Sequence, residues 1–113
     1  MIDYEMREIV DNLNTLGLAT NYSCQGNHRD GRILIAYISF SEGINLPVHL
    51  MEYIKSQKWQ IDRDYSDSCD GKRVIYSIYS VGTDFPKDFV ELKKRNTAFI
   101  EGWKNFLATK QEV

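Results

Sequence analysis

The residues best suited to chemistry lie together in one short segment, Thr20 to Arg32. It reads Thr-Asn-Tyr-Ser-Cys-Gln-Gly-Asn-His-Arg-Asp-Gly-Arg, and it holds a thiol, two aliphatic hydroxyls, an imidazole, two guanidiniums and two glycines. A connection that only reverses the chain between two strands needs about two to five residues. This segment is longer, and its polar groups are of the kinds that bind anions or transfer protons. It therefore indicates a functional site.

The first part of the candidate site is the run Ser23, Cys24, Gln25 and Gly26. A glycine directly after a strand lets successive backbone N–H groups turn toward one point, which forms an anion-binding concavity. The Ser23 hydroxyl can add a further donor. The alternative is a structural role, in which Gly26 supplies a positive φ angle and Cys24 packs as a small hydrophobic residue.

Basic residues supply the second part of the candidate site. His28 can act as a base or a ligand, and Arg29 beside it presents the planar fork that matches a phosphate or a carboxylate. Arg32 and Arg73 each begin one of the two strands that we place at the centre of the sheet, so we expect both at the same end of it. An anionic small molecule would then bind in one cavity beside them. The alternative is solvated surface charge that offsets nearby aspartates.

Tyrosines in the expected strands add flat ring surface. They are Tyr22, Tyr37, Tyr65, Tyr76 and Tyr79. Some must lie on the sheet face turned away from the helices, where a ring can stack on a base or another flat ligand. Tyrosine also favours strands for packing alone. Of these residues, Tyr22 and Tyr37 are assigned to the candidate site.

Cys24 also supports two weaker interpretations. With His28 it has the spacing of a shared zinc site, but a structural zinc site needs four ligands, and Cys69 and His49 are the only other soft candidates. As a nucleophile it would need the His28 imidazole within hydrogen-bond reach, and no acidic group is identifiable to orient that ring. The chain carries no P-loop, dinucleotide fingerprint or carboxylate pair. We therefore expect no metal and no cofactor, and binding rather than catalysis.

Three helices are expected to frame these residues. Apolar residues recur every three or four positions between Asp3 and Gly17, which indicates a helix with Asp3 as its N-cap. A second helix has Pro47 in its first turn, where a missing N–H costs nothing. Its expected buried stripe is Val48, Met51 and Ile54. The longest helix covers residues 86–110, and we expect its aromatic face to pack on the sheet.

Four strands are expected over residues 18–23, 33–40, 59–65 and 73–81. The run at 33–40 is too rich in β-branched and aromatic residues for an edge, so we place it and 73–81 at the centre. Residues 59–65 alternate with the period of a half-exposed strand. The order helix-strand-strand-helix-strand-strand-helix predicts a two-layer α+β sandwich with a four-stranded, mainly antiparallel sheet. Weak similarity between the halves suggests a degenerate (αββ) duplication.

The composition is typical of an ordinary globular chain. Its 113 residues are sufficient for a single α+β domain over 1–113, with 42% apolar and 27% charged residues. No run approaches the roughly 20 apolar residues of a membrane span, and the charged N-terminus is unlike a signal peptide. Together with two widely separated cysteines, Cys24 and Cys69, this predicts a cytoplasmic protein with reduced thiols. A net charge of −2 and a pI near 5.6 argue against general nucleic-acid binding.

The last helix also predicts self-association. Its aromatic residues Phe99, Trp103 and Phe106 exceed what a four-stranded sheet of this length covers, and large apolar surfaces seldom stay exposed. We therefore expect a homo-oligomer, most simply a two-fold dimer. The same helix face could instead block a partner protein.

Residues 17–28, Gly-Leu-Ala-Thr-Asn-Tyr-Ser-Cys-Gln-Gly-Asn-His, and residues 36–40, Ala-Tyr-Ile-Ser-Phe, resemble a group of small uncharacterised proteins from Gram-positive bacteria and their phages. In that group a helix and a G-x-x-T-x-x-S-C-x-G-H turn precede a Y-I-x-F strand. Here Asn27 separates Gly26 from His28. The likeness is confined to residues 17–40 and implies no particular activity.

A fainter similarity is to the wybutosine-synthesis family of tRNA methyltransferases, which carries a T-x-S-S-C-S-G-R strand-turn. The matching residues are Thr20, Ser23, Cys24 and Gly26, whereas His28 has no counterpart in that motif. This similarity would imply a tRNA-modifying enzyme.

Three functions follow from these patterns. The first is a non-enzymatic protein that binds a phosphorylated or nucleotide-like small molecule; with the phage-like resemblance, it could sequester a nucleotide signal of host immunity, an anti-defence role. The second is an interaction or inhibitor protein that acts through its aromatic C-terminal helix. The third is an enzyme, either of the tRNA-modification type or a Cys24-based transferase. We favour the first, with ligand-binding residues Tyr22, Ser23, Cys24, Gln25, Gly26, His28, Arg29, Arg32, Tyr37 and Arg73.

Overall fold

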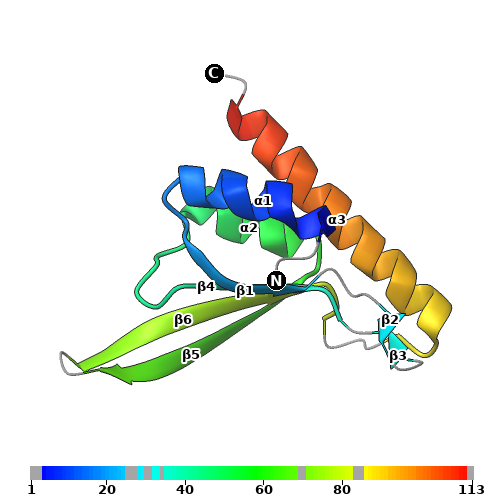
Figure 1. Ribbon diagram of the computed structural model, residues 1–113, viewed down its shortest axis with the longest axis horizontal. Coiled ribbons are helices and arrows are strands. Elements are labelled where there is room, and N and C mark those ends of the chain that lie inside the picture. Colours follow the sequence, from blue (N-terminus) through cyan, green and yellow to red (C-terminus); the bar gives the residue numbers. More distant parts are fainter. Residues whose placement is uncertain are drawn as a thin grey trace.

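The computed structural model of the chain describes residues 4–24, 28–29, 32–33, 35–68, 71–82 and 86–111. Three helices, α1 (Tyr4–Thr15), α2 (Val48–Ser56) and α3 (Phe89–Gln111), are separated by strands along the chain (Figure 1). The strands are β1 (Thr20–Cys24), β2 (His28–Arg29), β3 (Arg32–Ile33), β4 (Tyr37–Phe40), β5 (Gln60–Ser68) and β6 (Gly71–Tyr79). Apart from the short β2–β3 pair, the predicted order of helices and strands is confirmed.

The main sheet has four antiparallel strands in the order β1-β4-β6-β5. This confirms the predicted sheet and the central places of β4 and β6. β5 and β6 have nine residues each and extend beyond β4, whereas β1 and β4 have five and four. The sheet therefore has a four-strand end, where β4 begins and β6 finishes, and a two-stranded end at the tip of the β5–β6 hairpin.

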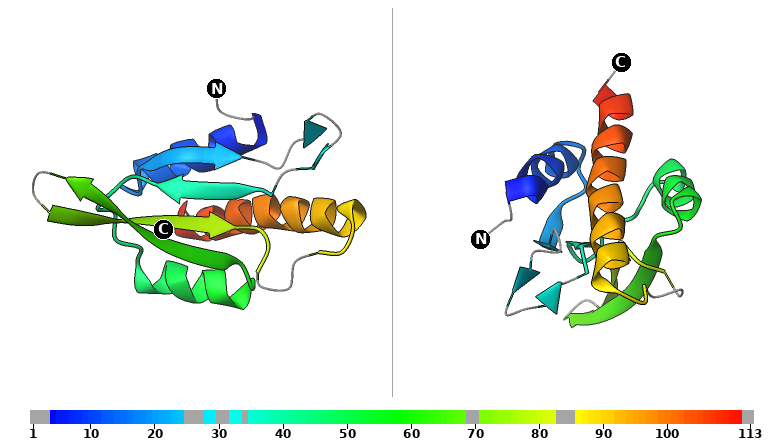
Figure 2. Two further views of the ribbon diagram at one scale, coloured as in Figure 1. Left: turned by 90° about the horizontal axis from the view of Figure 1, so that it is seen from below. Right: turned by 90° about the vertical axis from the view of Figure 1, so that its right-hand side faces the viewer.

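All three helices lie on one face of the main sheet, with α3 between α1 and α2 (Figure 2). Side chains from the helices and from the helix-facing side of the strands form the core, because burial of their apolar surface stabilises the two layers. The largest fully buried side chains are Trp103, Phe40, Phe99, Met6, Ile9, Leu13, Ile38, Leu50, Ile54 and Ile78. No helix of the described ranges covers the opposite face of the sheet, which we call the open face (Figure 2, left).

The aromatic stripe of α3 is interior. Phe99 and Trp103 are fully buried, and Phe106 is 6% exposed. Trp59, directly before β5, stacks on Trp103 with ring centroids 5.5 Å apart and meets Phe99 edge-on at 4.7 Å. A single chain thus covers these rings by itself. This removes the reason that the sequence offered for a dimer, or for a partner-blocking surface, on this helix face.

Two helix starts differ from the prediction. α2 begins at Val48 with Pro47 as its N-cap, so the proline lies one position before the helix rather than inside its first turn. The buried residues of α2 are Leu50 and Ile54, while Val48 is 74% exposed. α3 begins at Phe89, which is 58% exposed and does not belong to the core stripe. None of the helices within the described ranges is long and apolar enough to cross a membrane.

Candidate functional site

The open face gathers tyrosines at the four-strand end of the sheet. Directly paired residues of antiparallel strands place their side chains on the same face. One row crosses all four strands through Cys24, Tyr37, Tyr79 and Gln60, and a second row runs through Tyr22, Ser39, Ser77 and Asp62. The row between them consists of Ser23, Ile38, Ile78 and Ile61. This middle row points toward the helices, since Ile38 and Ile78 are fully buried.

Contacts and exposure agree with this assignment of faces. The rings of Tyr37 and Tyr79 lie 5.9 Å apart at an interplanar angle of 37°. The hydroxyl oxygens of Ser39 and Ser77 are 3.0 Å apart and share a hydrogen bond. Tyr22 is 68% exposed, while the other two tyrosines are half-buried. Tyr22, Tyr37 and Tyr79 thus lie on one face of three neighbouring strands, and we call them the tyrosine platform.

A register shift in β1 decides which of its side chains reach the platform. The pairing with β4 shifts between Thr20 and Tyr22, and such an irregularity changes the face that the following residues occupy. Tyr22 and Cys24 therefore lie on the open face. Ser23 pairs with the buried Ile38 and lies on the helix side. The sequence placed Ser23 and Cys24 in one ligand-binding turn, but the structure puts them on opposite faces of the sheet.

A buried asparagine on α3 holds the strands that carry the platform. Asn96 is 4% exposed, and its Oδ1 accepts hydrogen bonds from the Ala36 N–H at 2.9 Å and from the Ser80 hydroxyl at 2.7 Å. The Ser80 N–H also donates to the Ala36 carbonyl at 3.0 Å. Ala36 directly precedes Tyr37, and Ser80 directly follows Tyr79. The asparagine therefore fixes the two chain segments that set these tyrosines side by side.

The β5 border of the platform is acidic. Asp62 is exposed, and its Oδ1 accepts a hydrogen bond of 3.3 Å from Gln60 Nε2. Asp64 follows on the same face, two residues further along the strand. Arg63 lies on the helix side, with its guanidinium carbon 5.7 Å from the centroid of the Tyr76 ring. The arginine between the two aspartates is therefore turned away from the open face that both carboxylates border.

The structure describes part of the predicted polar segment. Gln25 and Gly26 lie outside the described residues. His28 and Arg29 form β2, Arg32 begins β3, and the register pairs Arg29 with Arg32. The positions of His28, Arg29 and Arg32 are thus given by the strands and by their register. β2 follows β1 and β3 precedes β4 along the chain, so this ladder adjoins the platform end of the sheet (Figure 1).

Arg73 lies at the opposite end of the sheet, contrary to the prediction. β4 and β6 are antiparallel neighbours, so their first residues are at opposite ends. The length of β6 between Arg73 and Tyr79 corresponds to about 20 Å along a strand. The Arg73 side chain instead reaches toward Gly43, in the loop after β4. The prediction that Arg73 and the Ser23–Arg32 segment share one cavity is therefore wrong.

Of the candidate soft ligands, His49 and Cys24 are not brought together. The His49 ring stacks on Phe106 of α3 with centroids 5.9 Å apart, so it belongs to the helix layer. Cys24 is half-buried on the open face, and Cys69 lies outside the described residues. Within the part of the chain that the structure describes, no three His, Cys, Asp or Glu side chains gather into a possible metal site. His49 and Cys24 lie on opposite sides of the sheet and are not placed to bind one metal ion.

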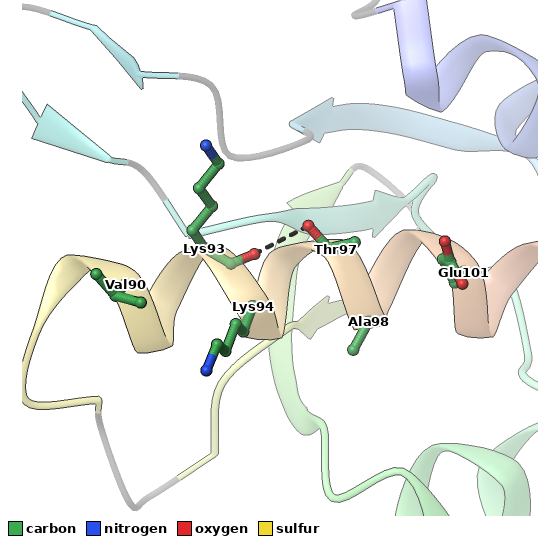
Figure 3. Close-up of a pocket in the computed structure, with 6 residues that line it drawn as sticks. All are labelled: Val90, Lys93, Lys94, Thr97, Ala98 and Glu101. Carbon is green, nitrogen blue, oxygen red and sulfur yellow. Dashed lines mark hydrogen bonds between the residues drawn. The ribbon is translucent and has the colours of Figure 1, made fainter.

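A second surface feature is a shallow depression of about 460 Å³ on α3 (Figure 3). Its described lining residues are Val90, Lys93, Lys94, Thr97, Ala98 and Glu101, all exposed. The Thr97 hydroxyl donates to the Lys93 carbonyl of its own helix at 3.1 Å, and Figure 3 shows the Lys93 and Lys94 side chains pointing away from each other. Binding pockets usually combine apolar walls with polar groups that converge. The tyrosine platform is therefore the stronger candidate.

Four residues of this site were not assigned to it from the sequence. Three of them, Gln60, Asp62 and Tyr79, lie on the open face. The alternation at 59–65 already predicts that Gln60 and Asp62 lie on the opposite face from Ile61. It does not predict which strand lies beside them. Asn96 has no comparable local signal, because its hydrogen-bond partners are distant in sequence.

Comparison of the chain with protein-family models, with curated proteins and with solved structures finds no significant match. Function is therefore inferred from the site itself. It is a sheet face that carries three tyrosines and, among the described residues, no helix. Carboxylates on β5 border it, and the ladder of β2 and β3 with its two arginines adjoins it.

Proposed function

We propose that the protein binds a small molecule with a flat aromatic ring, such as a nucleotide, on the tyrosine platform. The observation that carries this proposal is the meeting of Tyr22, Tyr37 and Tyr79 on a sheet face that no described helix covers. Aromatic side chains on an exposed sheet stack on bases, and each such contact contributes about 1–3 kcal/mol. The three rings therefore offer a stacking surface for the flat ring of a small ligand.

The platform is held in place before a ligand arrives. Tyr37 and Tyr79 lie on the two central strands, and the Asn96 hydrogen bonds hold the adjoining residues Ala36 and Ser80. Binding to a preorganised surface avoids the free-energy cost of ordering side chains and loops. This supports specific binding of a small molecule by a surface that is open to solvent.

The charge distribution favours a small ligand over a long nucleic acid. The chain has a net charge of −2, and Asp62 and Asp64 border the platform. A long polyphosphate backbone would have to pass these carboxylates, whereas non-specific nucleic-acid binding depends on neutralising phosphates with basic residues. Binding without catalysis fits a protein that sequesters a nucleotide, which is the role considered for the phage-like resemblance.

Isothermal titration calorimetry against mononucleotides, cyclic dinucleotides and ADP-ribose derivatives tests this proposal. We expect at least one of them to bind with a Kd below about 100 µM. Tyr22→Ala should weaken that binding by about 1–3 kcal/mol, since it removes one stacking ring. Tyr65→Ala is the matched control, because Tyr65 is 57% exposed but pairs with Val74 on the helix side of the hairpin. Failure of every ligand to bind, or equal losses in the two variants, would contradict the proposal.

A further inference from the structure

We infer that the tyrosine platform selects a guanine base, with the Asp62 carboxylate accepting hydrogen bonds from its edge. This inference rests on the proposed function and names the ligand class of the same site. Asp62 pairs with Ser77, and Gln60 pairs with Tyr79. Asp62 is therefore the diagonal neighbour of Tyr79 on β5, about 7–8 Å away between backbones. A base stacked on Tyr79 would extend its edge toward this carboxylate.

The chemistry of a carboxylate distinguishes the common bases. An ionised carboxylate only accepts hydrogen bonds, through two oxygens held side by side. Guanine presents two adjacent donors, N1–H and the N2 amino group, whereas adenine, cytosine and uracil present an acceptor beside each donor on the same edge. A carboxylate facing an acceptor leaves both groups without a partner, which costs binding free energy. Asp62 therefore favours guanine over the other bases.

The polar groups beside Asp62 are already hydrogen-bonded, whereas Asp62 itself can still accept hydrogen bonds from a base. Gln60 Nε2 donates to Asp62 Oδ1 at 3.3 Å and to the Ile61 carbonyl at 3.3 Å, so the amide orients the carboxylate. Each carboxylate oxygen has two lone pairs, and one such bond leaves acceptor capacity for a ligand. The hydroxyls of Ser39 and Ser77, in the same row, already share a hydrogen bond with each other at 3.0 Å.

Charge on the two sides of the platform sets the direction in which a nucleotide would lie. Asp62 and Asp64 on β5 repel a phosphate, so the phosphate would be directed to the β1 side. The β2–β3 ladder adjoins that side and carries Arg29 paired with Arg32. A guanine nucleotide thus matches the platform with its base edge at β5 and its phosphate toward β2 and β3.

Calorimetric titration with four nucleoside monophosphates, GMP, IMP, AMP and UMP, tests this inference at one fixed salt concentration. IMP is the informative comparison, because it keeps the N1–H of GMP but lacks the N2 amino group. We expect GMP to bind about tenfold tighter than IMP and tighter still than AMP or UMP. Asp62→Asn should weaken GMP binding about tenfold or more and leave AMP within about twofold. Asp64→Asn removes the same charge from the same face and should change GMP binding by less than about threefold.

The outcomes separate the two proposals. If nucleotides bind in a way that depends on Tyr22, but without preference for GMP, the guanine inference is wrong and the platform still binds. The same conclusion follows if Asp62→Asn and Asp64→Asn weaken GMP binding equally, because general charge would then explain the effect. If none of the four nucleotides binds, the guanine inference is wrong, and the platform proposal is then decided by the cyclic dinucleotides and ADP-ribose derivatives. If binding is unchanged in Tyr22→Ala, both proposals are wrong. Asp62 is exposed, and circular dichroism of Asp62→Asn would verify that the variant is folded.

Discussion

Asn96 is the residue on which the geometry of the tyrosine platform depends most directly. Its side chain reaches from α3 to the chain segments beside Tyr37 and Tyr79, and the residue is only 4% exposed. Buried polar groups are tolerated when they are hydrogen-bonded, and they then define one arrangement of the surrounding chain. The exposed face of the sheet is in this way specified by a side chain on its buried side.

Replacing Asn96 removes the acceptor for both the Ala36 N–H and the Ser80 hydroxyl. We expect Asn96→Ala to lower the free energy of unfolding by about 2–4 kcal/mol, because two donors lose their partner. Urea denaturation measures this change. Thr97→Ala, at the next and exposed position of α3, is the control and should remain within about 0.5 kcal/mol of the wild type. A fully stable Asn96→Ala variant would show that the two donors find other acceptors.

Tyr53 links α2 to α3 through a hydrogen bond that depends on pH. Its hydroxyl donates to the Gly102 carbonyl at 2.7 Å, and burial raises the pKa of Tyr53 above 10.0. The folded state favours the neutral phenol, so this contribution to stability is complete below pH 10 and is lost as the pH rises through the raised pKa.

Urea denaturation from about pH 8 to pH 11 tests this dependence. At about pH 8 we expect Tyr53→Phe to be less stable than the wild type by about 0.5–1.5 kcal/mol. Its stability should then decline less steeply at high pH, because the variant lacks the titrating group. Parallel declines in the two proteins would show that Tyr53 is not responsible.

Among the elements, α3 joins the helix layer to the sheet through a close approach at Gly102. A Cβ on this residue would lie 2.7 Å from Cζ2 of Trp59, and the Tyr53 hydroxyl would be 3.6 Å away. The Trp59 ring itself is confined by Phe99 and Trp103. The glycine therefore permits the helix to pack directly on the aromatic cluster at the start of β5.

We expect Gly102→Ala to destabilise the protein by about 1 kcal/mol. Alanine favours helix over glycine by about 1 kcal/mol, but overpacking a confined core typically costs about 1–3 kcal/mol. The same substitution made in a Trp59→Phe background, where the ring is smaller, should instead raise the free energy of unfolding. Thermal and urea denaturation of the four proteins measure both effects. A gain in stability from Gly102→Ala alone would mean that the Trp59 ring shifts without cost.

Local sequence patterns are sufficient to predict these elements but not their mutual direction. The alternation at 59–65 correctly indicates a half-exposed strand, and the β-branched run at 33–40 correctly indicates a central one, of which residues 37–40 form β4 while Ile33 belongs to β3. Arg32 and Arg73 are nevertheless expected at one end of the sheet and found at opposite ends. The antiparallel pairing of β4 and β6 that separates them depends on tertiary structure and not on the local sequence. The shift in β1 that turns Tyr22 to the open face is likewise set by its pairing with β4.

The burial of the aromatic face of α3 could likewise be predicted only in part. Periodicity correctly predicts that Phe99, Trp103 and Phe106 share one buried face. It does not say what covers them, and the cover is supplied within the chain by Trp59 and Tyr53. A local pattern indicates apolar surface, whereas its partner depends on how distant segments meet.

At the scale of the whole molecule, the three helices cover one face of the sheet, and no helix of the described residues lies on the other (Figure 2). Because a single chain buries the aromatic stripe of α3, we expect its stability to be independent of a second copy. The urea midpoint should be the same at protein concentrations of about 1 and 100 µM. A midpoint that rises with concentration would instead show that folding is coupled to association.

The binding of a nucleotide by the open face is tested most directly by chemical-shift mapping. Isotope-labelled protein would be titrated with GMP and its backbone amide signals followed by NMR. We expect the largest shifts at Tyr22, Tyr37 and Tyr79 and in the strands beside them, and little change along α3 at Lys94 or Ala98. Largest shifts at the α3 depression would contradict the proposal that the tyrosine platform is the binding site, and no shifts at millimolar GMP would contradict the binding of a guanine nucleotide there.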